Sequence, residues 1–523
     1  MSTAIAEHAR SRVHGQRSGE SDVPVAIHLM ENHDRAYHVW RDAGLRERVL
    51  VHIDAHHDMW WTEDAGSLSI ANFICPALRQ NIVRELYWVV PDGTWASSAG
   101  RAALRRHLRK IHERYPGEPA PVQWQGRSIR TSVLGRPFTI CSLGSLPDLR
   151  EQVLLDIDVD YLTIPRVSYD ERDAHNPLPW RWPSELIAML RAKRIGSDIV
   201  TIAYSVEGGY TPLAWKYLGT ELAARLRHSP DGCALEPYAR MQEGLVAQQR
   251  RDHAQAEAAF RDVGDRLGAA PHFCLAHLLA EHGQPAEGRR CYERAVAIDP
   301  SYRGAYASPG IVLHFARRFA EAEQAFRRTL LLDPSDPYAQ LGLGWVAVRR
   351  RNWVEAEQRS RASLAIQPDL IDAWRLHGTA LAKLGRLDEA IEAYERSLKL
   401  ALGGQRPFDG VIATEPDGAR LFDSSHGRTH AILARLHERK GDRKRATAGY
   451  RIAVAGGYDR FPVRFRLARI CAAQHRWSEA CTHAGAGLRS ALGAGWGVAA
   501  GGWRRAREFG TGARFMDPVT TAW

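Results

Sequence analysis

Two short segments rich in histidine and aspartate contain the residues best suited to chemistry. In the first, VLVHIDAHHDM, an apolar run leads directly into His52, Asp54, His56 and Asp58. These four occupy alternate positions, and alternate side chains of an extended chain point to the same side. The segment therefore predicts two imidazoles and two carboxylates on one face at the end of a strand.

The second segment, VLLDIDVDYL, places Asp156, Asp158 and Asp160 at alternate positions of an otherwise apolar run. Burying an unpaired carboxylate is very costly, so three such groups must be protonated, paired with cations or bound to metal. A further histidine, His33 in the segment MENHD, follows another apolar run. A metal centre accounts for all three segments with a single assumption.

Each motif taken alone also has an interpretation without metal. An Asp-x-His motif at a strand end is common in turns and helix caps, and an acidic strand can lie at a sheet edge with its carboxylates in water. His33 alone is typical of a buried core or capping histidine. His52 lies inside its apolar run, which favours a position in the core or behind the site over direct ligation.

The donor types indicate which metal such a centre would hold. Carboxylate-rich sites with one or two imidazoles favour hard or borderline ions such as Mn²⁺ over a thiolate-type zinc site. Five or six ligands around two shared carboxylates would hold two ions roughly 3.5 Å apart, a spacing that traps a bridging hydroxide. The expected chemistry is hydrolysis.

The elements that must position these residues are short apolar runs within about residues 22–230, separated by helical stretches at 97–114 and 183–193. This alternation predicts an α/β domain with a mostly parallel sheet. Sites in such sheets lie beyond the carboxyl ends of the strands, which is where the acidic and histidine-rich segments fall.

The second half of the chain has a different sequence pattern: residues from about 237 to 490 repeat with a period of 34. The residues that recur at this spacing are Pro300, Pro334 and Pro368; Gly310, Gly344 and Gly378; Ala322, Ala356 and Ala390; and Glu287, Glu321, Glu355 and Glu389. Such a period indicates a solenoid of stacked helix pairs.

The repeat resembles the tetratricopeptide repeat, since Pro368, Trp374, Gly378, Ala390 and Tyr394 match its consensus. Ser360 departs from it at the position of a large aromatic residue. About seven units are expected, interrupted near 403–427 by an insertion that is either a tolerated surface loop or a lid. The concave surface of such an array suits an extended peptide or a partner protein.

The expected organisation is a flexible N-terminus (1–22), an α/β domain (23–230), the repeats (237–490) and a C-terminal cap or tail (491–523). The net charge of +11 comes mostly from arginines spread over helical patterns, which argues against a nucleic-acid partner. There is no apolar run of about 20 residues and no apolar secretory segment near the start, so we expect a cytoplasmic protein without a membrane partner.

The motifs DAHHD and DIDVD resemble those of the arginase and deacetylase superfamily. The wider words ENHD, VHIDAHHDM, SIANFICPAL, LLDIDVDYL and TIAYSVEGGYTP look like one arginase-like branch, which includes peptide arginases of ribosomal peptide maturation. The resemblance covers about residues 23–225. It implies a three-layer α/β domain and an enzyme that converts arginine side chains of a precursor peptide to ornithine, with release of urea.

The resemblance also implies a set of metal ligands. One manganese would be held by His33, Asp54, Asp58 and Asp158, and the other by Asp54, His56, Asp158 and Asp160. Asp54 and Asp158 would bridge the two ions, and Asp156 matches an outer position that contacts the ligands. Single-zinc deacetylases have a histidine where this chain has Asp160, which favours the dinuclear arm of the superfamily.

Glu207, in YSVEGGYTP, falls where arginases place the carboxylate that binds the substrate guanidinium, and a turn glutamate is the alternative. Asp58 would bind metal and orient the nucleophile. Two features depart from the arginase pattern: MENHD replaces the usual glycine-rich histidine motif, and the proposed proton-shuttle histidine has no counterpart. Neither His57 nor Asn72 is assigned a role.

The prediction is therefore a dimanganese peptide arginase whose repeats bind the peptide or a partner protein. Two alternatives stay open. The first is a ureohydrolase or amidohydrolase that acts on a small molecule, and the second is a non-catalytic repeat scaffold.

Overall fold

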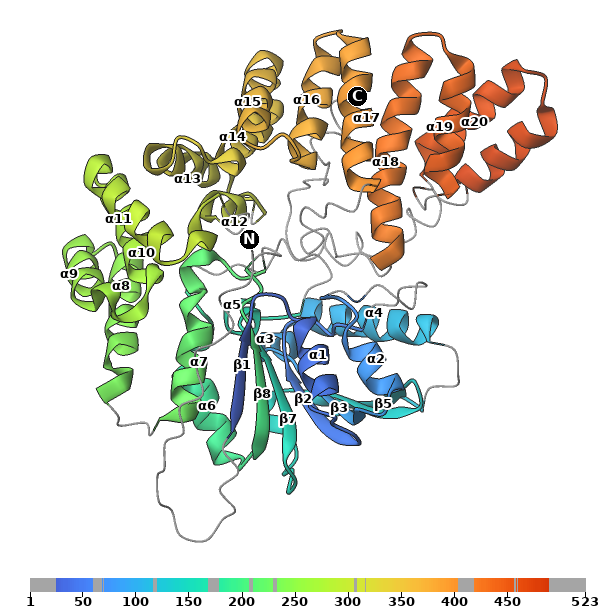
Figure 1. Ribbon diagram of the computed structural model, residues 1–523. Helices are drawn as coiled ribbons and strands as arrows, with labels where there is room; N and C mark the ends of the chain where they lie inside the picture. Colours follow the sequence, from blue (N-terminus) through green and yellow to red (C-terminus); the bar gives the residue numbers. More distant parts are fainter. Residues whose placement is uncertain are drawn as a thin grey trace.

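The computed structural model describes residues 25–59, 68, 70–115, 120–167, 178–206, 210–228, 233–304, 308–315, 317–402, 418–455, 458 and 460–488. The expected flexible N-terminus (1–22), residues 403–417 of the insertion and the C-terminal segment (491–523) lie outside this part of the chain. Figure 1 shows a sheet covered by helices, followed by helix pairs that form an arch.

One sheet of eight strands forms the α/β domain. The strands are β1 (Ala26–Met30), β2 (Arg48–Ile53), β3 (Val83–Val89), β4 (Gln123–Gln125), β5 (Ser128–Val133), β6 (Arg136–Cys141), β7 (Val153–Asp158) and β8 (Ser197–Ala203). Their order is β1-β8-β7-β2-β3-β6-β5-β4. In this order, all neighbouring strands between β1 and β6 pair in parallel, whereas the last two pairs, β6-β5 and β5-β4, are antiparallel. The expected mostly parallel sheet is thus confirmed, with an antiparallel edge.

Helices cover both faces of this sheet. The helices α1 (Arg35–Asp42), α2 (Ile74–Arg79) and α4 (Ser98–Arg114) bury their apolar residues against one face. The helices α6 (Pro183–Ala192) and α7 (Tyr217–Arg227) cover the other face. Two further short helices, α3 (Gly93–Ala96) and α5 (Asp160–Thr163), begin just beyond the carboxyl ends of β3 and β7.

The second half of the described chain is helical. The pairs are α8 (Glu236–Gln249) with α9 (His253–Val263), α10 (Ala269–Glu281) with α11 (Pro285–Ile298), α12 (Pro309–Phe315) with α13 (Phe319–Leu332), α14 (Pro337–Arg349) with α15 (Trp353–Ile366), α16 (Ile371–Lys383) with α17 (Leu387–Leu402), α18 (Gly418–Arg439) with α19 (Arg443–Ala455), and α20 (Phe461–Ala473) with a helix over 477–488. The end of the insertion is therefore helical, because α18 begins at Gly418 rather than after residue 427. None of the helices in the described part of the chain is long and apolar enough to cross a membrane.

The 34-residue period comes from one repeated contact between the two helices of a pair. A Cβ atom on Gly378 would lie 2.8 Å from the Tyr394 ring, so this position needs glycine for the close approach. Where Ser360 replaces the aromatic residue, its hydroxyl lies 2.9 Å from His377 Nδ1. There Leu376 fills the space, since a Cβ on Gly344 would lie 2.4 Å from its Cδ2 atom.

The sheet and the first repeats share one hydrophobic core, which runs from β7 and β8 through α7 into α8–α11. A largely buried lysine also links them. Lys216 Nζ donates to Asp299 Oδ2 at 2.9 Å and to Ser301 Oγ at 2.9 Å, and it pairs with Glu31 beside the end of β1. In Figure 1 the end of the sheet that carries α3 and α5 faces the arch of repeats.

Candidate metal centre

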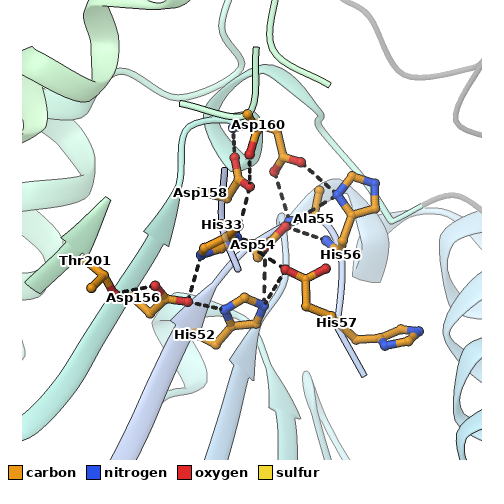
Figure 2. A network of polar contacts seen from close by, with 12 residues as sticks. His33, His52, Asp54, Ala55, His56, His57, Asp156, Asp158, Asp160 and Thr201 are labelled. Atoms are coloured by element: carbon orange, nitrogen blue, oxygen red, sulfur yellow. Dashed lines mark hydrogen bonds and ion pairs between the residues drawn. The ribbon is translucent and has the colours of Figure 1, made fainter. Parts of the chain in front are cut away.

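The polar residues of the three sequence segments meet beyond the carboxyl ends of β1, β2 and β7 (Figure 2). His33 follows β1, Asp54 directly follows β2, and Asp158 is the last residue of β7. The strands β7 and β2 are adjacent, and β8 alone separates β1 from β7. The parallel topology therefore brings together residues that are more than 100 positions apart.

The expectation that strand alternation alone aligns these side chains is wrong. The strand β2 ends at Ile53, and Asp58 has a positive φ of 46°. Asp160 does not belong to a strand either, because it begins α5. Tight turns align the groups instead: His56 N donates to Asp54 Oδ1 at 2.6 Å, and Asp160 N donates to Asp158 Oδ1 at 2.9 Å. Aspartate favours such turns because its carboxylate accepts from the backbone two residues on.

The first group of ligand atoms surrounds the imidazole of His33. Its Nδ1 atom lies 3.1 Å from Asp158 Oδ2, 3.2 Å from Asp58 Oδ2 and 3.3 Å from Asp54 Oδ2. Ligands at about 2.1 Å from one ion, at right angles to each other, are roughly 3 Å apart. The spacing of this group is that of neighbouring ligands around a single ion.

The second group lies around His56, which is half-buried. Its Nδ1 atom is 2.7 Å from Asp160 Oδ2 and 3.5 Å from Asp54 Oδ1. Asp54 therefore presents one oxygen to each group. The structure thus brings together all six predicted ligands, which are His33, Asp54, His56, Asp58, Asp158 and Asp160.

Asp156 lies behind these groups and is fully buried. Its Oδ2 atom lies 2.8 Å from His33 Nε2 and 2.8 Å from His52 Nδ1, and its Oδ1 atom accepts from Thr201 at 2.5 Å. Burial acts to raise the pKa of Asp156, but the two imidazoles hold this pKa below its usual range. Asp156 is thus an ionised acceptor in the outer position that the sequence predicted.

The donor set fits a divalent cation. Three buried atoms, His33 Nδ1, His52 Nε2 and Asp54 Oδ2, make no hydrogen bond within the described part of the chain. Burial, and then the charges of Asp160, Asp58 and Asp158, raise the pKa of Asp54 to about 8. Burial and the neighbouring charge of Asp160 also raise the pKa of Asp158. Buried carboxylates that repel one another are stabilised by a metal ion, which supplies the missing positive charge.

Other residues named from the sequence have various positions. Glu207 lies outside the described residues, so its expected role stays a prediction. His57 points away from the cluster in Figure 2 and packs against Trp88 at 5.5 Å between ring centroids. Asn72 is buried. Tyr210 packs edge-on against the ring of His56, at 4.7 Å between centroids.

Two contributors were missed from the sequence. Ser205 donates to Asp158 Oδ2 at 2.5 Å, and Thr201 supports Asp156 from the neighbouring strand. Thr201 stands directly opposite Asp156 in the β7-β8 register. A lone threonine within the apolar run DIVTIA is the only signal the sequence offered for it.

Comparison with known protein families identifies the repeats within residues 269–402. Tetratricopeptide repeat models match residues 269–302, 310–371 and 371–402. The C-terminal part is a tetratricopeptide repeat array. No curated protein sequence matches the chain significantly.

Several solved structures are similar to this chain. The crystal structure of MamA has 14% identity, a TM-score of 0.29, and coverage of 36% of this chain and 96% of that chain. That of YrrB, titled a TPR protein with an unusual peptide-binding site, has 20% identity, a TM-score of 0.24, and coverage of 36% and 86%. The APC/C hetero-tetramer Cut9-Hcn1 has 14% identity, a TM-score of 0.31, and coverage of 52% and 48%.

Proposed function

We propose that this chain is a peptide arginase, a dimanganese hydrolase that converts arginine side chains of a peptide to ornithine and releases urea. The observation that carries the proposal is the pair of buried ligand groups, which share Asp54 between them. The arginase-like motifs of the sequence indicate the substrate class, a guanidinium group. The guanidinium substrate, the hydrolytic activity and the manganese ions are parts of this proposal.

Each site residue has its own role in this proposal. When bound, two divalent ions would supply an activated water and stabilise the charge that develops on the substrate. Asp54 and Asp158 would contribute to both ion positions, while His33 and Asp58 would complete one and His56 and Asp160 the other. Asp58 would also orient the nucleophile. Glu207 would pair with the guanidinium, for which a carboxylate offers two parallel acceptors.

The repeats have a place in the same proposal. Tetratricopeptide arrays present a concave surface that suits an extended peptide. In Figure 1 the arch of repeats faces the end of the sheet where the candidate metal centre lies. This arrangement supports an array that holds the peptide or a partner protein beside the site.

A direct assay tests the proposal. Protein loaded with Mn²⁺ is incubated with arginine-containing peptides and with free arginine, and the release of urea and the mass of each product are measured. We expect ornithine in peptides, and its loss in Asp158→Asn. The matched control is Asp198→Asn, which changes a partly exposed carboxylate paired with Arg48 at the opposite end of β8.

The outcomes separate the candidate functions. Urea from free arginine alone would favour a small-molecule ureohydrolase. No urea from any substrate, although two ions are bound, would rule out guanidinium chemistry. A chain that binds no metal would leave a repeat scaffold, which is the function that the tetratricopeptide array supports on its own.

A further inference from the structure

His52 occupies an unexpected position in the candidate metal centre. It lies inside β2 and is fully buried, and the sequence favoured a role in the core or behind the site. Its Nε2 atom lies 3.3 Å from Asp54 Oδ2 and 4.0 Å from Asp58 Oδ2. Figure 2 shows the ring pointing toward the same carboxylates that surround His33.

The orientation of the ring is set by Asp156. Nδ1 of His52 lies 2.8 Å from Asp156 Oδ2, and the same oxygen lies 2.8 Å from Nε2 of His33. Each imidazole donates one N–H to this carboxylate and turns its other nitrogen toward Asp54. A carboxylate behind a histidine is the usual device that fixes the tautomer of a metal-binding imidazole. Here one carboxylate serves two histidines.

The inward nitrogen of His52 makes no hydrogen bond to another described residue. This Nε2 atom faces the carboxyl oxygens of Asp54 at 3.3 Å and of Asp58 at 4.0 Å. A lone pair that faces carboxylates is repelled unless a proton or a cation lies between them. The ligand atoms of His33, His52 and Asp54 all lie within 4.8 Å of one another, close enough to share one ion.

We infer that His52 is a direct ligand of the same ion as His33. This inference rests on the metal centre of the proposed function, but not on its substrate. The first position then has two imidazoles and the carboxylates of Asp54, Asp58 and Asp158. The second position, with His56, has a single imidazole. The two positions are chemically unequal, and the one richer in nitrogen should favour Fe²⁺ or Co²⁺ over Mn²⁺ more strongly than the other does.

The test removes the ligand atom and keeps the hydrogen bond to Asp156. The substitution His52→Asn replaces Nδ1–H by an amide N–H and deletes Nε2. Metal content after dialysis, Mn²⁺ affinity in competition with a chelator, and nitrogen couplings in pulsed EPR are measured. The matched control is His107→Asn, a buried histidine on α4 whose ring packs against that of His57.

We expect the wild type and His107→Asn to bind two ions and His52→Asn to bind one of them at least tenfold more weakly. Loss of a partner that only orients a ligand already costs about 10–100-fold, so loss of a ligand should cost no less. The EPR spectra should lose one nitrogen coupling. Two ions bound with unchanged affinity and unchanged couplings in His52→Asn would overturn the inference.

Measurements on the wild type keep the inference testable if the variant does not fold. Three directly coordinated imidazole nitrogens are expected over the two ions, in protein labelled with ¹⁵N-histidine, and two would contradict the inference. A wild type that binds no ion would also overturn it. Two bound ions with three nitrogen couplings and no urea release would uphold the ligand and refute the proposed substrate.

Discussion

Removal of metal should make the stability of the α/β domain fall as the pH rises from 7 to 9. Burial, and then the neighbouring carboxylates, raise the pKa of Asp54 to about 8. The pKa values of His33 and His52 are also raised, because contacts with carboxylates outweigh a burial that acts in the opposite direction. In the unfolded chain the carboxyl has a pKa of about 3.9 and the imidazoles about 6.5.

The direction of this change in stability follows from whether the folded or the unfolded chain holds the protons. Between pH 7 and 9 the folded, metal-free chain holds protons that the unfolded chain has lost, so stability is lost as the pH passes each folded-state pKa. For Asp54 alone, a folded-state pKa of about 8 gives a loss of about 1.4 kcal/mol between pH 7 and 9. The histidines add losses of the same sign. Asp156 and Asp160, with lowered pKa values, contribute stability that is nearly complete above about pH 5 and constant between pH 7 and 9.

Scanning calorimetry at pH 7, 8 and 9 measures the effect, with and without Mn²⁺, on the wild type and on Asp54→Asn. The metal-free wild type should show a falling transition temperature. The Mn²⁺-loaded protein should lack this loss, because the ions replace the protons. Asp54→Asn without metal should show a smaller fall. A metal-free stability that is constant or rises with pH, or an equal fall in Asp54→Asn, would refute this account.

Three further substitutions test the fold and the site. Lys216→Met leaves its two carboxylate partners without their shared cation. Urea denaturation should show that the free energy of unfolding falls by about 2–3 kcal/mol, which is less than for a fully buried pair because both partners are partly exposed. Gly342→Ala places a Cβ 2.1 Å from Phe326 Cζ and should cost about 1–3 kcal/mol, whereas Gly144→Ala, 3.9 Å from its nearest neighbour, should cost almost nothing. Asp156→Asn should weaken Mn²⁺ binding about 10–100-fold in chelator competition; unchanged values would contradict each expectation.

The central parallel strands β2 and β7 could be predicted because both of their faces are buried, so their sequences are continuous apolar runs. The antiparallel edge could not. The strand β4, Gln123–Gln125, is short and exposed, and the residues of β5 alternate between buried and exposed. Such an edge has the composition of a loop until its partner strand is known. Its own pairings are local hairpins, with Gln125 opposite Ser128 and Val133 opposite Arg136, and only the pairing of β6 with β3 joins them to the sheet over a long range.

The candidate site was predictable to the extent that its residues are unusual in their surroundings. Aspartates inside or just after apolar runs are rare enough to stand out, and all six predicted ligands do meet. The role of His52 depends on which ring nitrogen faces Asp156, and ring orientation has no sequence signature. Likewise Ser205, which donates to Asp158, itself has a positive φ of 53°, a turn conformation that its residue type does not predict.

The junction between the two halves bears on how repeats could serve a hydrolase. A flexible linker would raise only the local concentration of a bound peptide, since it fixes no direction of approach. Here the core runs without interruption from β8 into α11, and Lys216 joins Asp299 of the repeats to Glu31, two residues before His33. In the proposed function, a peptide held by the array would therefore have a fixed orientation relative to the candidate metal centre. Choice among several arginines of one peptide requires such an orientation, whereas hydrolysis of free arginine does not.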